Sequence, residues 1–187
     1  MHMTPFFSAA ALVTSLWWGG AAAFAGTTVY REVILRDGPI VYYEFDETEG
    51  PTAANSAVTG ATYTAAFNTT GGAITPGQAS FAEGGTAYDF EGGIVEAASA
   101  LTSSLSSWTL EAWVNYDPGK ASASNFLSND QGGWNDDVLF GIGAESGEVG
   151  VPSGQVGVIH QDQVNRTRDF VSTPLVAGRW NHVVVTG

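Results

Sequence analysis

Three acidic residues near the start of the chain have a spacing that could support catalysis. Glu44, Asp46 and Glu49 lie within the string EFDETE. Two carboxyl groups held about 5 Å apart can cleave a glycosidic bond, one acting as the acid and the other as the nucleophile. In an extended strand Glu44 and Asp46 share one face, and a β-bulge would bring Glu49 to the same side. The spacing therefore makes glycoside hydrolysis one candidate function.

A second group of polar residues gathers in the string DQGGWNDD, which begins at Asp130. Asp130, Asn135, Asp136 and Asp137 supply oxygen atoms, and calcium binds about six to eight oxygen ligands. The alternative is an acidic, solvated turn, in which Asn and Asp are present because they tolerate a left-handed backbone. The string thus predicts a candidate calcium site with Asp130, Asp136 and Asp137 as its ligands.

The same string contains an aromatic residue among the polar ones. Trp134 could be exposed, and an exposed indole ring can stack on a sugar ring or on a partner while its N–H remains a donor. The ring could equally fold back over the core. Trp134 and its neighbour Asn135 are therefore the candidate ligand-binding residues.

The strands that must position these residues are predicted from alternation. Residues 107–117 form a run rich in aromatic and β-branched residues, which indicates a central strand. In this strand Glu111 and Trp113 share one face, whereas Leu110 and Val114 share the other. A second run of the same character, residues 178–187, ends the chain.

Residues 40–45 predict the opening strand. Its aromatic residues Tyr43 and Phe45 belong on the core, so Glu44 and Asp46 point outward. An acid on an outward face lacks the partial burial that raises the pKa of a hydrolase acid. Short strands at regular spacing, joined by Gly-rich turns, complete the pattern of an all-β sandwich.

Composition narrows the class of function. The chain has 187 residues, which suits one domain with a real core, and it has no cysteine, so disulfide bonds and cysteine-ligated zinc are excluded. Six Lys and Arg against 19 Asp and Glu give a net charge of -13. Such a chain repels phosphate backbones and anionic lipids, so we expect no nucleic-acid partner.

The N-terminal residues predict export. Residues 6–25 carry no charge, and Ala23-Phe24-Ala25 has the small-x-small form of a signal-peptidase site. We expect a signal peptide over residues 1–25 and no membrane insertion after its removal; an uncleaved membrane anchor is the alternative. Residues 26–38 form a short N-terminal segment with a helix from Thr28 to Asp37, and the domain covers residues 39–187.

Four phrases in order resemble one family. They are PIVYYEFDETEG from Pro39, AYDFEGGIVE from Ala87, TLEAWV from Thr109 and GRWNHVVV from Gly178. Together they resemble the bacterial secreted laminin-G-like domains of the concanavalin A-like lectin/glucanase superfamily. The resemblance implies a two-sheet antiparallel jelly-roll β-sandwich. It also implies that at least one hairpin should follow Gly187, so we expect an incomplete C-terminus and a last strand without a partner.

The resemblance also bears on the candidate sites. The E-x-D-x-x-E string matches the signature of laminarinase-type hydrolases, but in laminin-G-like domains similar carboxylates occur at this place without catalysis. The same family implies calcium ligation at Asp136 or Asp137. It further implies that His182 is a structural histidine satisfied by backbone groups rather than a base or metal ligand. We place Trp113 and Trp180, like Trp108, in the core.

These observations lead to one main expectation. We expect an exported, non-catalytic binding or adhesion module that recognises an extracellular glycan or protein, with calcium as a candidate cofactor. The alternatives are a laminarinase-type glycoside hydrolase using Glu44, Asp46 and Glu49, and a structural spacer domain of a surface protein.

Overall fold

One α-helix, one 3-10 turn and eleven short β-strands make up the part of the chain that this computed structural model describes. The described residues are 23–82, 84–98, 107–119, 124–128, 137–142, 154–161, 166–170 and 174–187. The strands form several small antiparallel sheets, so the expectation of a mostly β chain is confirmed. The finer prediction of a two-sheet jelly roll remains a prediction.

The helix α1 covers Ala23–Arg36 and begins five residues before the predicted start at Thr28. It ends where Gly38 adopts a left-handed φ of 69° and its N–H bonds to the carbonyl of Leu35, because glycine enters this conformation without the cost that a Cβ imposes. Most of the predicted signal peptide, residues 1–22, lies outside the described residues. Among the described helices, none is long and apolar enough to cross a membrane.

The first half of the chain forms two sheets. Strands β1 (Thr52–Ala53), β2 (Ala65–Asn68) and β5 (Ile94–Ala97) make a three-stranded sheet with β2 in its centre. Strands β3 (Ala73–Ala79) and β4 (Thr86–Glu91) pair with each other. The 3-10 turn Gly60–Tyr63 precedes β2. The strand pairs of both sheets are antiparallel, and one isolated bridge, between Ala73 and Gly92, is parallel.

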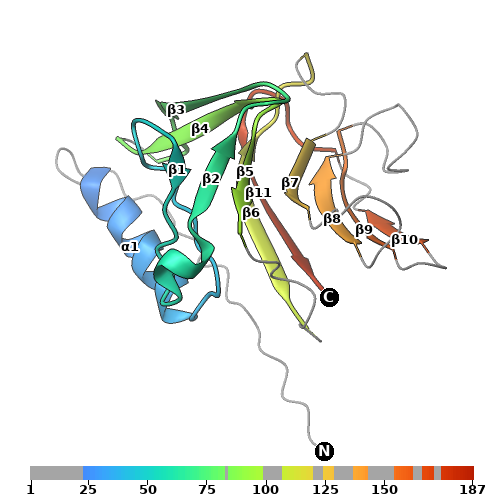
Figure 1. The fold of residues 1–187 in the computed structure, drawn as a ribbon, viewed down its shortest axis with the longest axis horizontal. Helices are drawn as coiled ribbons and strands as arrows, with labels where there is room; N and C mark the ends of the chain where they lie inside the picture. Colours follow the sequence, from blue (N-terminus) through green and yellow to red (C-terminus); the bar gives the residue numbers. More distant parts are fainter. Residues whose placement is uncertain are drawn as a thin grey trace, which may run out of the picture.

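The second half forms the other two sheets. Strands β7 (Ser124–Ser128), β8 (Asp137–Ile142), β9 (Val156–Gln161) and β10 (Arg166–Phe170) lie in the order β10-β9-β8-β7. Strand β6 (Thr109–Asn115) pairs with β11 (Trp180–Thr186) over the full length of both. In Figure 1 the β6–β11 pair lies between helix α1 and the four-stranded sheet.

Two expectations about individual strands are wrong. The last strand, β11, does have a partner, because each of its seven residues pairs with a residue of β6. Residues 40–45 form no strand; this segment makes only an isolated bridge between Tyr43 and Asn55. Phe45 has a positive φ of 54°, which lies outside the extended region and interrupts the alternation of side chains.

Two hydrophobic clusters hold these sheets together. The first contains Ala53, Ala65 and Tyr88, and the aromatic residues Tyr43 and Phe45 pack against it as predicted. The second lies between β6–β11 and the four-stranded sheet. It contains Phe140, Val156 and Val183, and its surrounding residues are Leu110, Ala112, Val114, Val158, Leu175 and Val185. The inner face of the β6–β11 pair therefore contributes to the hydrophobic core, and the outer face of the pair makes different contacts.

Candidate functional site

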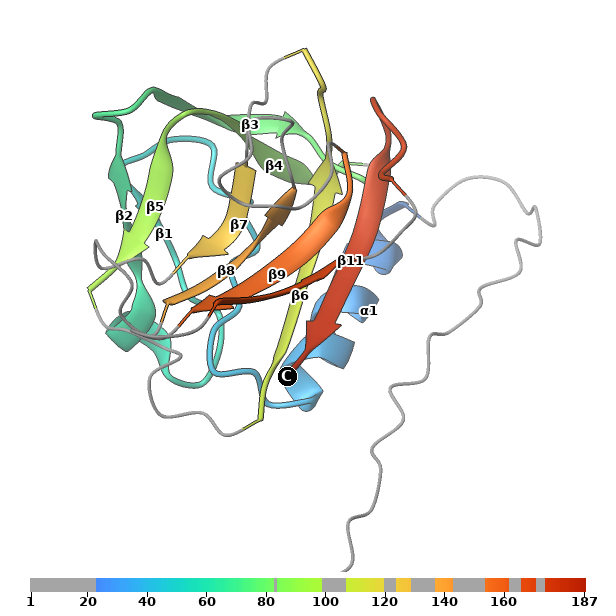
Figure 2. The ribbon, with the colours of Figure 1, turned by 90° about the vertical axis from the view of Figure 1, so that its right-hand side faces the viewer.

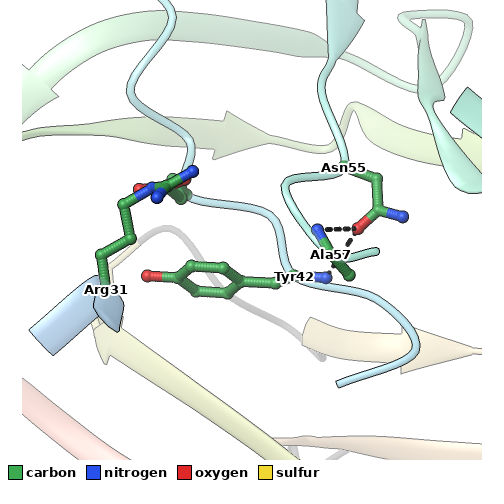
Figure 3. Close-up of polar contacts among 5 residues, drawn as sticks. Arg31, Tyr42, Asn55 and Ala57 are labelled. Atoms are coloured by element: carbon green, nitrogen blue, oxygen red, sulfur yellow. Dashed lines mark hydrogen bonds and ion pairs between the residues drawn. The ribbon is translucent and has the colours of Figure 1, made fainter. Parts of the chain in front are cut away.

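The first carboxylate of the opening segment is paired with the helix. Glu44 Oε1 lies 2.8 Å from Nε of Arg31, and the Glu44 side chain is only 18% exposed. The carboxylate raises the pKa of Arg31 through this hydrogen bond. Figure 3 shows Arg31 extending from α1, with the ring of Tyr42 pointing toward it. Glu44 therefore faces Arg31 of helix α1 rather than open solvent.

The other two candidate carboxylates are exposed. Although Asp46 is exposed, partial desolvation of its carboxyl group, followed by repulsion from Glu44 and Glu47, raises its pKa. Glu49 lies in the turn before the cis Gly50–Pro51 bond. Because the positive φ of Phe45 interrupts the strand, the simple alternation that would align Glu44 with Asp46 is absent.

A carboxylate that the sequence did not single out has a structural role. Glu47 Oε1 accepts the N–H of Ala54 at 2.6 Å, and Glu47 Oε2 accepts the hydroxyl of Tyr88 at 2.6 Å. Tyr88 is buried in the first cluster. Glu47 thereby ties the opening segment to β4 and to Ala54, the residue that follows β1. No short motif marks it, since its two partners lie seven and 41 residues away.

This contact predicts a loss of stability at alkaline pH. Burial and the hydrogen bond to Glu47 raise the pKa of Tyr88 above its ordinary value of 10.0, and burial raises that of Tyr42 to about 12. The folded state therefore keeps protons that the unfolded chain releases above about pH 10, so stability falls as pH rises further. Urea unfolding from about pH 9 to 11 should show this fall. The fall should be shallower in Tyr88→Phe, and equal slopes in the two proteins would contradict the assignment.

The segment before these carboxylates is positioned by one buried amide. Asn55 Oδ1 accepts the N–H groups of Tyr42 at 2.8 Å and Ala57 at 3.2 Å, as Figure 3 shows. Its Nδ2 donates to Thr59 Oγ1 at 2.8 Å and to the carbonyl of Gly60 at 3.1 Å. Asn55 is 8% exposed. All four hydrogen bonds of the amide are therefore satisfied inside the protein.

The predicted calcium and ligand loop lies almost entirely outside the described residues. This applies to Asp130, Trp134, Asn135 and Asp136. Asp137 is the first residue of β8 and pairs with Gln161 of β9. Within the described part of the chain, no group of three or more His, Asp or Glu residues could hold a metal ion.

A different group of polar and aromatic residues gathers on the outer face of β6–β11. The register places His182 opposite Trp113 and Val184 opposite Glu111, so all four share the face turned away from the second cluster. His182 Nε2 lies 2.8 Å from Glu111 Oε1. The two residues thus form a diagonal cross-strand pair, and the prediction that backbone groups satisfy His182 is corrected by this side-chain contact.

Helix α1 contributes a hydroxyl to this group. Figure 2 shows α1 alongside β6 and β11. The Tyr30 hydroxyl donates to Glu111 Oε1 at 2.8 Å and accepts the indole N–H of Trp113 at 3.0 Å. Burial and the hydrogen bond to Glu111 raise the pKa of Tyr30. The hydroxyl is therefore held between one carboxylate acceptor and one indole donor.

Aromatic rings surround this hydroxyl. The ring of Trp113 stacks on Phe81, with centroids 4.4 Å apart and planes at 12°, and on His182, with centroids 4.8 Å apart. Phe81 also meets Tyr30 and Trp180 edge to face. Trp113 and Trp180 therefore lie on the outer face rather than in either buried cluster. We call Tyr30, Phe81, Glu111, Trp113 and His182 the outer-face cluster.

The sequence contained part of the signal for this cluster. Alternation alone placed Glu111 and Trp113 on one face, and aligning the two Trp-containing strands would have added His182. Nothing local identified Tyr30, which reaches Glu111 across 81 positions of sequence. Trp108 lies beside Gly187, because the backbone N–H and carbonyl of Trp108 both form hydrogen bonds with Gly187.

Comparison with known proteins gives no match to this chain among family models, curated proteins or solved structures.

Proposed function

We propose that this chain is an exported, non-catalytic binding or adhesion module that recognises an extracellular glycan or protein. We also propose the finer fold, a laminin-G-like jelly roll of the concanavalin A-like class, on the strength of the four sequence phrases. The observation that carries the function is the outer-face cluster, in which stacked rings adjoin a carboxylate. Aromatic faces with a few polar groups are the usual composition of a ligand site.

The contacts of the opening carboxylates favour binding over hydrolysis. A retaining hydrolase needs a nucleophile and an acid free to meet the substrate. Glu44 is engaged by Arg31 in an ion pair, and Glu47 is engaged by Ala54 and Tyr88. These side chains hold α1 and β4 to the opening segment. Glu49 is exposed in a turn.

A glycan array probed with the secreted chain, with and without calcium, tests the proposal. We expect retention of neutral glycans and no release of reducing ends when the bound glycan is incubated with the protein. Turnover of a β-1,3- or mixed-linked glucan that disappears in Glu44→Gln would instead establish the hydrolase. A protein that retains no glycan would leave the glycan part of the proposal without support.

Calcium is a candidate cofactor through Asp130, Asp136 and Asp137. If Asp136 or Asp137 ligates the ion, calcium should raise the melting temperature, because a ligand that binds only the folded state stabilises it by mass action. The combined change of Asp136→Ala and Asp137→Ala should abolish this rise while leaving the calcium-free melt nearly unchanged. An equal rise in both proteins, measured by differential scanning fluorimetry, would exclude these ligands.

A further inference from the structure

We propose that the Tyr30 hydroxyl occupies a subsite for a glycan hydroxyl, and that a neutral glycan binds the outer-face cluster by displacing helix α1. This inference rests on the proposed binding function and adds to it a site, a ligand class and a form of regulation. In this proposal, helix α1 competes with the glycan for the outer-face cluster. The glycan displaces Tyr30, and Glu111 and Trp113 then form hydrogen bonds with the glycan hydroxyl.

The polar contacts of Tyr30 define the subsite. A carboxylate oxygen at 2.8 Å accepts its proton, and an indole N–H at 3.0 Å donates to its oxygen. A sugar hydroxyl has the same two capacities, one O–H donor and lone pairs that accept. The hydrogen bond to a charged carboxylate is stronger than one between neutral groups. Glu111 and Trp113 are thus arranged to hold one hydroxyl, whether it belongs to tyrosine or to a sugar.

The rings around the subsite provide the stacking surface. Phe81 is 41% exposed, and the His182 side chain is 39% exposed. Both rings therefore keep surface available to solvent, and the departure of Tyr30 would uncover more of Phe81 and Trp113, which its ring now touches. The apolar C–H face of a sugar can bury against such rings.

Charge selects the class of glycan. Glu111 lies in the centre of the cluster, and its described partners are Tyr30 and His182. The chain carries a net charge of -13. Both features disfavour sulfated and uronic acid-containing glycans, because like charges repel. The ligand expected from this chemistry is a neutral glycan.

The attachment of α1 is weak enough for displacement. Val29 and Val33 of the helix are 57% and 39% exposed, and Ile34 and Leu35 are half-buried, so none of these apolar residues of α1 is fully buried. Besides Tyr30, the helix is held by the ion pair of Arg31 with Glu44, a surface contact in which the two side chains are 45% and 18% exposed. Exposed ion pairs contribute little to stability. A ligand that replaces the Tyr30 hydroxyl therefore removes a main attachment of α1.

Titration of the full secreted chain with laminarihexaose, cellohexaose and mannohexaose tests the inference by calorimetry. When a site is open only part of the time, the apparent affinity falls by the open fraction. Tyr30→Ala should therefore bind at least one of these hexasaccharides about tenfold more tightly than wild type, which corresponds to about 1.4 kcal/mol. Val29→Ala, a change at an exposed position of the same helix, should bind as wild type does.

A second substitution tests whether Glu111 binds the glycan hydroxyl. In the Tyr30→Ala background, Glu111→Gln should remove most of the gain, since the amide is a weaker acceptor of a hydroxyl proton than the carboxylate. If Tyr30→Ala fails to fold, Tyr30→Phe takes its place, with a gain of about threefold expected because its ring still covers the rings beneath.

Each outcome decides the matter. Equal or weaker binding in the Tyr30 variant, or a gain that survives Glu111→Gln, would overturn the inference while leaving the binding function intact. Absence of binding in both wild type and variant would overturn the inference. The same result on the wider glycan array would overturn the glycan function as well.

Discussion

Replacing Phe140 with alanine should destabilise the protein more than truncating any of its partly exposed aromatic residues. Phe140 is 1% exposed, and among the residues whose burial the structure describes it is the large side chain that is fully buried. Phe140 belongs to β8. In the second cluster it packs with Val156 of β9 and with Val183 on the inner face of β11. Truncation of a buried phenylalanine costs about 3–5 kcal/mol, because a transfer term and a cavity term add.

The measurement is urea unfolding of wild type and Phe140→Ala, compared with Phe90→Ala as a matched control. Phe90 is 40% exposed and touches Phe45 and Tyr88 at the edge of the first cluster. Its truncation should cost less than half as much. If Phe140→Ala were no more damaging than Phe90→Ala, β6–β11 could not be packed on the four-stranded sheet as described.

Replacing Asn55 with alanine should cause the second large loss of stability. The side chain makes four hydrogen bonds, and removal of the amide leaves the N–H groups of Tyr42 and Ala57 without their acceptor. Buried polar groups that lose a partner cost about 1–3 kcal/mol each, so a total of about 2–4 kcal/mol is expected after local rearrangement. Chemical denaturation monitored by tryptophan fluorescence would measure it.

Two further variants distinguish the role of Asn55 from a general effect of losing an amide. Asn68 also makes two hydrogen bonds, to Glu96 and to the N–H of Thr70, but both of these bonds are exposed to solvent; Asn68→Ala should cost about 1 kcal/mol or less. Asn55→Asp keeps the acceptor but cannot donate to Gly60 when ionised, so it should destabilise more at about pH 7 than at about pH 4. The reverse order would contradict the assignment of the amide nitrogen.

The sequence predicted those parts of the fold that follow from local pattern. Alternation in residues 109–115 separated Glu111 and Trp113 from Leu110 and Val114, and the two groups do face opposite sides of β6. The two runs that each contain a tryptophan were expected as strands, and they form β6 and β11. Period-2 patterns are informative because one face of these strands is buried.

What the sequence did not predict depends on contacts between distant residues. The positive φ of Phe45 interrupts a segment whose pattern is that of a strand, and its ring packs against Tyr88 at 4.9 Å. Tertiary packing overrode local preference there. The contact of Tyr30 with Glu111 likewise depends on where α1 docks, which no local propensity specifies.

Hydrogen exchange with and without a bound neutral glycan is the most direct test of where this protein binds its ligand. The Tyr30→Ala protein, saturated with the hexasaccharide that it binds best, should show slower exchange in peptides covering β6 and β11. The wild-type protein should in addition show faster exchange in α1, because the glycan displaces the helix. Protection confined to peptides covering residues 129–137, with β6, β11 and α1 unchanged, would place the ligand at Trp134 and contradict the assignment to the outer-face cluster.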